Sequence, residues 1–321
     1  MGKKVLVTGG AGFIGSNFCN LNKEKFDVTA LDNLFLGDPA NLDEDVRFIE
    51  GDACKAEDLD KVGPVDYVVH LAGTSSAPMF MDDGFVDGYV NSVKSFVTVL
   101  DWARKNGVQK VIYASTSSLY GNNPLPLTED QHVTPLNHYA VTKQVYEHAA
   151  ACYNKVYPQM DIIGFRFMSV YGPNEEAKGQ FANLVSQFCW DYARGKEPVI
   201  YGDGSQTRDF TNVRDVVQGI TLAIDSEKKL GADVFNIGTG HATSLNEICQ
   251  ALEAAFDNEI KAKYIENPVK EGYVRGQWAD ISKIREVLGY EPKVKLEDGI
   301  REQVENVRLE RIRKTSSDSL R

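Results

Sequence analysis

The sequence predicts an α/β protein with a doubly wound parallel sheet and a smaller, mixed α/β C-terminal domain. Two observations carry this prediction. Short β-branched runs recur through the first half of the chain, and each is followed by a longer stretch of mixed apolar and polar residues. The runs are almost continuously apolar, as expected for strands that are covered on both faces. After Arg166 this regularity ends, and loops rich in Gly, Pro and Asn appear.

Six runs mark the strands of the first sheet: residues 4–7, 28–31, 46–49, 67–71, 110–114 and 162–165. The longest helices are expected over about residues 86–104 and 139–157. A late apolar run at residues 234–237 could return to the first sheet. We therefore predict a first domain over residues 1–166, with a segment near 205–240 returning to it. The second domain then covers residues 167–321.

Composition and charge restrict the classes of function. Hydrophobic residues make up 42% and charged residues 25% of the 321 positions, as in ordinary globular proteins. The formal net charge of −11 disfavours nucleic acid and anionic membranes as partners. A phosphate-bearing ligand must therefore be met by a few local cations.

The cysteines indicate a reducing compartment. Cys19, Cys54, Cys152, Cys189 and Cys249 are odd in number and widely scattered, which predicts free thiols rather than disulfides or a metal site. An apolar run of about 18 residues, the length of a membrane span, does not occur in the sequence. The N-terminal apolar strand leads at once into glycines, unlike a signal peptide. We expect a cytoplasmic protein.

The first strand leads into a glycine-rich loop that is typical of dinucleotide binding. Gly9, Gly12 and Gly15 are three residues apart, with Phe13 and Ile14 between the last two. Glycine permits a tight turn and lets backbone N–H groups approach a pyrophosphate, and the following helix N-terminus adds partial positive charge. The order of strand, glycines, helix and second strand makes the motif far more specific than glycines alone.

Acidic residues end the second and third strands. Asp32 lies 17 residues after Gly15, where a carboxylate accepts hydrogen bonds from the adenosine ribose and repels a 2′-phosphate. NAD is therefore favoured over NADP. Asp52 follows the third strand, where it is either placed to reach the adenine edge or is a plain solvated turn residue.

Tyr139 and Lys143 lie one helical turn apart, an arrangement that can supply a general base. A neighbouring ammonium favours phenolate and should lower the pKa of the tyrosine. The chain has a second such pair, Tyr192 and Lys196, which falls at a helix end and which we interpret as chance. The first pair follows a strand that ends in a cluster of hydroxyl side chains at residues 115–118. Because ligands bind beyond the carboxyl ends of parallel strands, this cluster and Tyr139 should face the same crevice as the glycine loop.

From residue 3 to about residue 299 the chain resembles the extended short-chain dehydrogenases/reductases that act on nucleotide sugars. Besides the glycine loop and Tyr139/Lys143, the resemblance rests on motifs at residues 32–34, 70–73, 115–121, 135–143, 166–173, 201–210 and 278–283, and on Asn91. It implies a Rossmann-type fold, NAD as cofactor, a nucleotide sugar as substrate and a homodimer. Nucleic acid, a membrane and a metal ion are not expected as partners.

The resemblance also implies roles for individual residues. Tyr139 is the base, Lys143 binds the nicotinamide ribose, and Thr116 bonds the reacting oxygen. The implied cofactor contacts are Gly9, Gly12, Phe13, Ile14, Gly15, Asp32, Asn33, Asp52, Ala53, Leu71, Ala72, Gly73, Asn91, Tyr139 and Lys143. The implied substrate contacts are Ser75, Ser117, Ser118, Ser169, Arg208, Lys270, Arg275 and Gln277.

The two residues after Thr116 indicate the subclass. Sugar dehydratases of this family have Asp-Glu there and decarboxylases keep a Glu, whereas this chain has Ser117 and Ser118. That is most similar to UDP-glucose 4-epimerases and their UDP-hexose and UDP-hexuronate relatives. The implied reaction removes hydride from sugar C4 to NAD while Tyr139 takes the O4 proton, and then returns hydride to the other face. The alternatives are other nucleotide-sugar enzymes of the family, namely a UDP-hexuronate or UDP-N-acetylhexosamine 4-epimerase, a C5 epimerase or a 4-ketoreductase. A catalytically silent sensor of NAD or nucleotide sugars is an alternative of a different class.

The substrate side departs from the family at several positions. Ser169 stands where the family has an Asn that contacts the nucleotide, and Lys270 replaces an Arg, so that Arg275 could share the phosphate contact. Arg208 matches the family's diphosphate-binding arginine; its alternative is a surface salt bridge with Asp209. Gln277 occupies the position that lines the space for the C2 substituent, which favours UDP-glucose with UDP-N-acetylglucosamine as a poorer substrate. A patch of Phe96, Val99, Leu100 and Trp102 is interpreted as packing, including a helix bundle between two copies.

Overall fold

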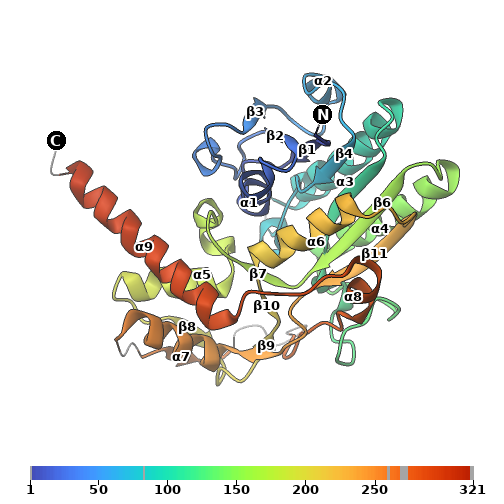
Figure 1. Cartoon of the computed structure of the whole chain (residues 1–321). Helices are drawn as coiled ribbons and strands as arrows, with labels where there is room; N and C mark the ends of the chain where they lie inside the picture. The colour runs from blue at the N-terminus through green and yellow to red at the C-terminus, as the bar shows by residue number, and fades with distance from the viewer. Residues whose placement is uncertain (1, 82–83, 259–260, 268–273, 319–321) are drawn as a thin grey trace.

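A seven-stranded parallel sheet forms the centre of the computed structural model, which describes residues 2–81, 84–258, 261–267 and 274–318 (Figure 1). Its strands are β1 (Lys4–Thr8), β2 (Asp27–Asp32), β3 (Arg47–Glu50), β4 (Tyr67–His70), β5 (Lys110–Thr116), β6 (Asp161–Phe167) and β11 (Ala232–Ile237). They lie in the order β11-β6-β5-β4-β1-β2-β3. All six expected strands are present. The late strand β11 does return to the sheet, where it pairs in parallel with β6.

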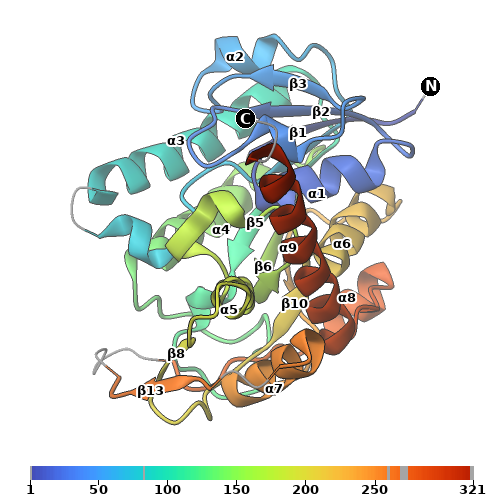
Figure 2. The ribbon, with the colours of Figure 1, turned by 90° about the vertical axis from the view of Figure 1, so that its left-hand side faces the viewer.

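Helices cover both faces of this sheet (Figure 2). One face carries α1 (Phe13–Asn22), α6 (Val213–Asp225) and α8 (Ser282–Leu288), and the other carries α2 (Ala56–Asp60), α3 (Gly84–Lys105) and α4 (His138–Val156). Successive residues of β1 point to opposite sides, so Val5 packs in the core with Phe18 while Leu6 packs with Phe96. The predicted doubly wound parallel sheet is therefore confirmed.

The second part of the chain is smaller and mixed. It pairs β7 (Ser169–Tyr171) with β10 (Phe210–Asn212), β8 (Val199–Tyr201) with β13 (Lys263–Ile265), and β9 (Thr207–Arg208) with β12 (Thr243–Ser244). Helices α5 (Leu184–Ala193), α7 (Leu245–Phe256) and α9 (Leu296–Asp318) pack together. They share a separate core that includes Val185, Ile248 and Ile300. Single 3-10 turns η1 (Pro39–Asn41), η2 (Ala77–Phe80), η3 (Ser117–Tyr120) and η4 (Glu176–Phe181) occur in the connections.

The apolar patch on α3 lies inside the molecule. Phe96, Val99, Leu100 and Trp102 are all buried against the sheet and its helices. The interpretation as packing therefore holds, but these side chains are not available to a helix bundle between two copies. The burial follows from their spacing, which places them on the face of α3 that the sheet covers.

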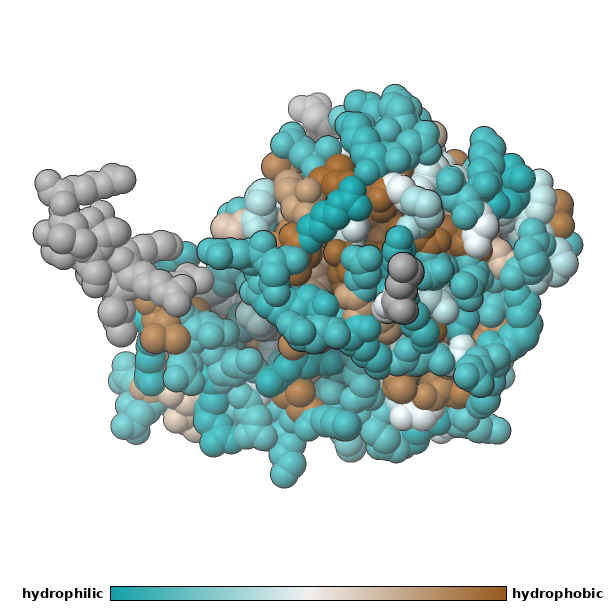
Figure 3. Space-filling view, turned by 45° about the horizontal axis from the view of Figure 1, so that its top comes forward, coloured by the Kyte–Doolittle hydropathy of each residue, from teal (hydrophilic) through white to brown (hydrophobic). Residues whose placement is uncertain are grey.

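The outer surface agrees with the acidic, polar composition. Figure 3 shows a face on which hydrophilic side chains dominate and hydrophobic ones form small patches. Among the helices of the described residues, we find none that is both long and apolar enough to cross a membrane. A search of the same residues finds no group of three or more His, Cys, Asp or Glu side chains placed to hold a metal ion.

Candidate active site

A cavity of about 630 Å³ lies between the carboxyl ends of the central strands and the second part of the chain. It gathers nearly all the site residues that the sequence predicts. They are Gly9, Gly12, Phe13, Ile14, Gly15, Asp32, Asn33, Asp52, Ala53, Leu71, Ala72, Gly73, Ser75, Asn91, Thr116, Ser117, Ser118, Tyr139, Lys143, Ser169, Arg208 and Gln277. Arg275 is not among the lining residues; its side chain is exposed and its backbone oxygen accepts from the Thr207 N–H. Lys270 lies outside the described residues.

The glycine loop brings backbone to the cavity wall. Gly9 has φ +70°, and a Cβ there would lie 2.8 Å from the backbone nitrogen of Ala72. A Cβ on Gly15 would collide with the carbonyl oxygen of Gly9. Helix α1 then begins with Gly12 as its N-cap, without a side-chain cap and without an acidic residue in its first turn. Its first N–H groups therefore suit an anion such as a pyrophosphate, so the loop fits a dinucleotide.

Asp32 stands at the end of β2 with its carboxylate fixed by the backbone. The Ala11 N–H donates to Oδ2 over 3.1 Å and the Leu34 N–H donates to Oδ1 over 2.8 Å. The residue is only 8% exposed, and this burial raises the pKa of the carboxyl above its usual value, while the backbone donors oppose the shift. A Cβ on Gly37 would lie 2.7 Å from Oδ1, so the loop is closely fitted around this acid. Asp52 both lines the cavity and accepts from the Cys54 N–H, as a turn residue does.

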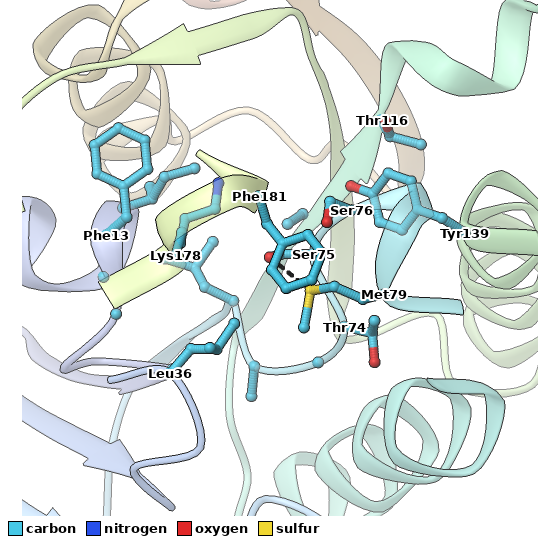
Figure 4. A pocket seen from close by; sticks show the side chains of 18 of the residues that line it. Phe13, Leu36, Thr74, Ser75, Ser76, Met79, Thr116, Tyr139, Lys178 and Phe181 are labelled. Atoms are coloured by element: carbon cyan, nitrogen blue, oxygen red, sulfur yellow. Dashed lines mark hydrogen bonds between the residues drawn. The ribbon is translucent and has the colours of Figure 1, made fainter. Parts of the chain in front are cut away.

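The side chains of Tyr139 and Thr116 contact each other at the wall of the cavity. Asn137 caps α4 by accepting from the Ala140 N–H over 2.8 Å, which places Tyr139 in the first turn. Thr116 ends β5, and its hydroxyl hydrogen-bonds the phenol. The Thr116 oxygen also accepts from the Ser118 N–H over 3.1 Å, which fixes its position. Figure 4 shows Tyr139 and Thr116 together at one end of the cavity.

The expected effect of Lys143 on Tyr139 is corrected by the structure. Burial raises the pKa of the Tyr139 phenol, and the group that lowers it is Thr116. Lys143 is only 4% exposed, and its burial lowers the pKa of its own ammonium to about 7. Its Nζ lies 4.3 Å from the centroid of the Tyr146 ring and 5.9 Å from that of Tyr139. Desolvation, which spacing along a helix does not reveal, therefore outweighs the predicted charge effect.

A buried ion pair behind the cavity joins α4 to the sheet. Arg166 on β6 donates to both carboxylate oxygens of Glu147, over 2.9 and 2.7 Å. The Ser115 hydroxyl, next to Thr116, donates to the same carboxylate over 2.6 Å. Glu147 lies one turn beyond Lys143, so this pair holds the helix of Tyr139 against the strand of Thr116. No local sequence pattern marks this ion pair, because Glu147 and Arg166 lie on different elements and 19 residues apart in the chain.

The substrate-side residues come from several connections. Gln277 is buried, and its amide nitrogen donates to the Ser117 carbonyl over 3.0 Å. Arg208 donates to the carbonyl oxygens of Thr207 and Val274. The expected alternative for Arg208 was a salt bridge with Asp209, but that carboxylate is buried and accepts from Thr239, Gly240 and Ala279.

The loop that includes η4 adds lining residues that the sequence analysis missed. Glu175, Lys178 and Phe181 line the cavity. In Figure 4 Lys178 extends toward Phe13, and Phe181 lies between Lys178 and Met79. In the sequence this stretch looks like a solvated charged loop, so no periodic signal could have marked it.

The second Tyr/Lys pair does not form a site. Tyr192 lies buried in the core of the second part, and α5 ends at Ala193, before the exposed Lys196. The pair is therefore not on one helix face, and neither residue lines the cavity.

The fold and the cavity define a dinucleotide-dependent enzyme of the short-chain dehydrogenase/reductase type. The model of the NAD dependent epimerase/dehydratase family matches residues 5–238. The chain belongs to this family. This confirms the predicted family and NAD as the cofactor. The predicted class of NAD-dependent nucleotide-sugar 4-epimerase is confirmed by the relatives and solved structures of that class.

Three nucleotide-sugar 4-epimerases are similar to this chain over nearly its whole length. The UDP-glucose 4-epimerase of Mycolicibacterium smegmatis is 34% identical over 94% of this chain and 97% of its own length. The crystal structure of UDP-glucose 4-epimerase from Thermotoga maritima with UDP-glucose has a TM-score of 0.89, at 31% identity over 96% of this chain and 99% of that one. The UDP-N-acetylglucosamine 4-epimerase from Methanobrevibacter ruminantium, in complex with UDP-N-acetylmuramic acid, has a TM-score of 0.88, at 30% identity over 95% of this chain and 97% of that one.

Proposed function

We propose that the protein interconverts UDP-glucose and UDP-galactose by inverting the configuration at C4. The observation that carries this proposal is the Tyr139–Thr116 pair beside Ser117 and Ser118 in one cavity. The pair supplies a base and a hydroxyl for one sugar oxygen. The two serines lack the carboxylates that the elimination of water or carbon dioxide by related enzymes would use.

The reaction divides between the cofactor and the side chains. NAD, when bound, accepts a hydride from the sugar and donates it back. Tyr139 takes the proton of the C4 hydroxyl and later returns it, and Thr116 hydrogen-bonds the same oxygen. Because burial raises the pKa of Tyr139, the bond from Thr116 is needed to stabilise the phenolate. Lys143 is assigned to the nicotinamide ribose.

Other residues of the cavity are assigned by their positions. We assign the cofactor pyrophosphate to the N-terminus of α1, the adenosine ribose to Asp32 and the adenine edge to Asp52. Arg208 is assigned to the diphosphate of the sugar nucleotide. Gln277 is assigned to the C2 substituent, since it is buried and fixed to Ser117 at the cavity wall.

The sugar is proposed to be glucose or galactose, with N-acetylated sugars as poorer substrates. Gln277 is smaller than the tyrosine that would exclude an acetamido group, and its neighbour Gly276 permits a backbone shift. UDP-hexuronates, C5 epimerisation and 4-keto reduction are the remaining alternatives within the family.

The proposal also includes the domain organisation, the oligomeric state and the location of the protein. We propose a cofactor domain over residues 1–166 plus the returning segment near 205–240, and a substrate domain over the rest of 167–321, which is supported by the separate core of the second part. Helix α8 is an exception within this range, because Ile284 and Leu288 pack in the core of the first sheet. We also propose a homodimer. Helices α3 and α4 lie side by side, and both expose apolar side chains, which are Phe85, Val86, Val90, Val97, Val145 and Val156. A cytoplasmic location is supported by the free cysteines of the described residues.

One experiment tests the activity directly. Purified protein is incubated with UDP-glucose, UDP-galactose, UDP-N-acetylglucosamine and UDP-glucuronate without added cofactor, and the C4 epimers are separated. We expect turnover of the first two, and an at least ~100-fold slower rate for Tyr139→Phe. The control Tyr192→Phe should turn over normally. A requirement for added NADH at each turnover would indicate a reductase, and binding of NAD and UDP without any turnover would indicate a silent sensor.

A further inference from the structure

Lys178 is a cation of the cavity to which the proposed function gives no role. Among the described lining residues three are basic, namely Lys143, Lys178 and Arg208. Four lining residues are acidic: Asp32, Asp52, Asp87 and Glu175. A cavity that takes both NAD and a nucleotide sugar must accommodate two diphosphates, although the chain carries a net charge of −11. Each basic side chain in the cavity is therefore important for balancing the negative charge of these diphosphates.

The other two basic residues already have assigned roles, Lys143 at the nicotinamide ribose and Arg208 at the diphosphate of the sugar nucleotide. Lys143 is buried beneath Tyr139 and lies over the Tyr146 ring. Arg208 donates two hydrogen bonds to carbonyl oxygens at one side of the second part. Lys178, in contrast, lies beside Phe13, the residue that follows Gly12 of the glycine loop.

A buried glutamate fixes Lys178 at the cavity wall. Glu175 is 0% exposed, and its carboxylate accepts from the Ser186 hydroxyl over 2.6 Å and from the Asn183 N–H over 2.8 Å. Lys178 Nζ donates to Oε1 of the same carboxylate over 3.1 Å. Because a buried carboxylate is costly unless it is paired, Glu175 restrains a side chain that would otherwise be mobile. The ammonium has three N–H donors, so two are left beyond Glu175.

The restrained ammonium stands over the start of α1. Its Nζ lies 5.5 Å from the centroid of the Phe13 ring, within cation–π range. Phe13 is the first residue of α1, the helix whose first turn has neither a side-chain cap nor an acidic residue. A basic side chain from the second part thus lies beside the first residue of this uncapped helix, at the end of the cavity away from Tyr139 (Figure 4).

We propose that Lys178, positioned by Glu175, donates hydrogen bonds to a diphosphate held between the glycine loop and the second part of the chain. The diphosphates of NAD and of a UDP-sugar share this chemistry, and the inference rests on the proposed function for the presence of these ligands. Lys178 is then a binding residue that joins the two parts of the chain through the ligand. It takes no part in the proton transfer by Tyr139.

The test replaces Lys178 with Met and measures the two ligands separately. UDP and uridine are titrated into the NAD-loaded protein, and NAD is titrated into protein freed of cofactor. We expect affinity for at least one diphosphate to fall about tenfold to a hundredfold, the effect of losing a hydrogen bond from a charged donor. Uridine, which has no phosphate, should bind as it does to the wild type. Lys178→Arg should restore most of the affinity, and Lys196→Met, which removes an exposed lysine outside the cavity, should have no effect.

The possible outcomes distinguish the diphosphate of UDP from that of NAD. They also distinguish failure of this proposal from failure of the proposed function. A loss for UDP alone assigns the substrate diphosphate, a loss for NAD alone assigns the cofactor diphosphate, and a loss for both assigns a shared contact. Affinities for UDP and NAD within twofold of those of Lys196→Met, or an equal loss for uridine, would overturn the proposal. If Lys178→Met does not fold, Lys178→Gln, which keeps a donor for Glu175 without the charge, provides the same comparison. A wild-type protein that binds UDP and NAD but epimerises no UDP-sugar would refute the proposed function alone.

Discussion

Replacing Lys143 with Met should make the cofactor-free protein more stable while abolishing its activity. Lys143 is buried beneath the cavity, and the cause of its altered pKa is desolvation alone, which lowers the pKa from 10.5 to about 7. A charged ammonium in this place is therefore a cost to the fold. Met has a similar length and fills the same volume without that cost.

The size of the effect follows from linkage. Between pH 7 and 10.5 the unfolded chain holds a proton on this lysine that the folded chain lacks, so the stability of the wild type rises with pH across that window. The destabilisation is complete below pH 7 and disappears as the pH approaches 10.5. At 1.36 kcal/mol for each tenfold difference, we expect the Met variant to be more stable by about 5 kcal/mol at pH 6 and about 2 kcal/mol at pH 9.

Urea unfolding of cofactor-free wild type and Lys143→Met at pH 6, 7.5 and 9 measures this directly. Cofactor must be removed because NAD stabilises any variant that binds it. Tyr139→Phe is a matched control, which should lose activity without gaining this pH-dependent stability. A Met variant that is less stable at pH 6, or an advantage that does not shrink toward pH 9, would refute the assignment of a buried, desolvated lysine.

Three further predictions concern cofactor choice, substrate and architecture. NAD should bind much more tightly than NADP, and Asp32→Asn should narrow the gap; NADP extracted from the purified protein would contradict this. Gln277→Tyr should abolish turnover of UDP-N-acetylglucosamine while sparing UDP-glucose, and an unchanged ratio of the two rates would show that this residue does not line the sugar pocket. Arg166→Met should cost about 3–5 kcal/mol of unfolding free energy because it leaves the largely buried Glu147 carboxylate without its ionic partner, and adding Glu147→Leu should recover much of it; denaturant unfolding that shows no such recovery would refute the pairing.

Local signals accounted for most of the first sheet. Each of its strands is a short apolar run. Runs of this kind are expected where helices cover both faces of a sheet. The glycine loop was equally predictable, because close backbone contacts such as that of Gly9 with Ala72 leave no room for a Cβ. Tyr139 and Lys143 were singled out because a strand with terminal hydroxyls precedes their helix.

The second part was less predictable. Its two-stranded sheets hold only two or three residues in each strand, too few for a periodic pattern. The loop with Glu175 and Lys178 has no signature either, since a Glu and a Lys three residues apart are common on solvated surfaces. Only the packing of η4 against α5 buries the carboxylate and turns that pair into a fixed element of the cavity.

The sequence by itself determined the parallel sheet, the cofactor loop, the acid at Asp32 and the Tyr139/Lys143 pair, because each depends on residues close together in the chain. The tertiary structure alone decided the contact of Gln277 with Ser117, the position of Lys178 over Phe13 and the low pKa of Lys143. The physical reason is the same in each case. Desolvation and hydrogen bonding depend on which groups surround a side chain, and here those groups come from segments 160 residues or more apart.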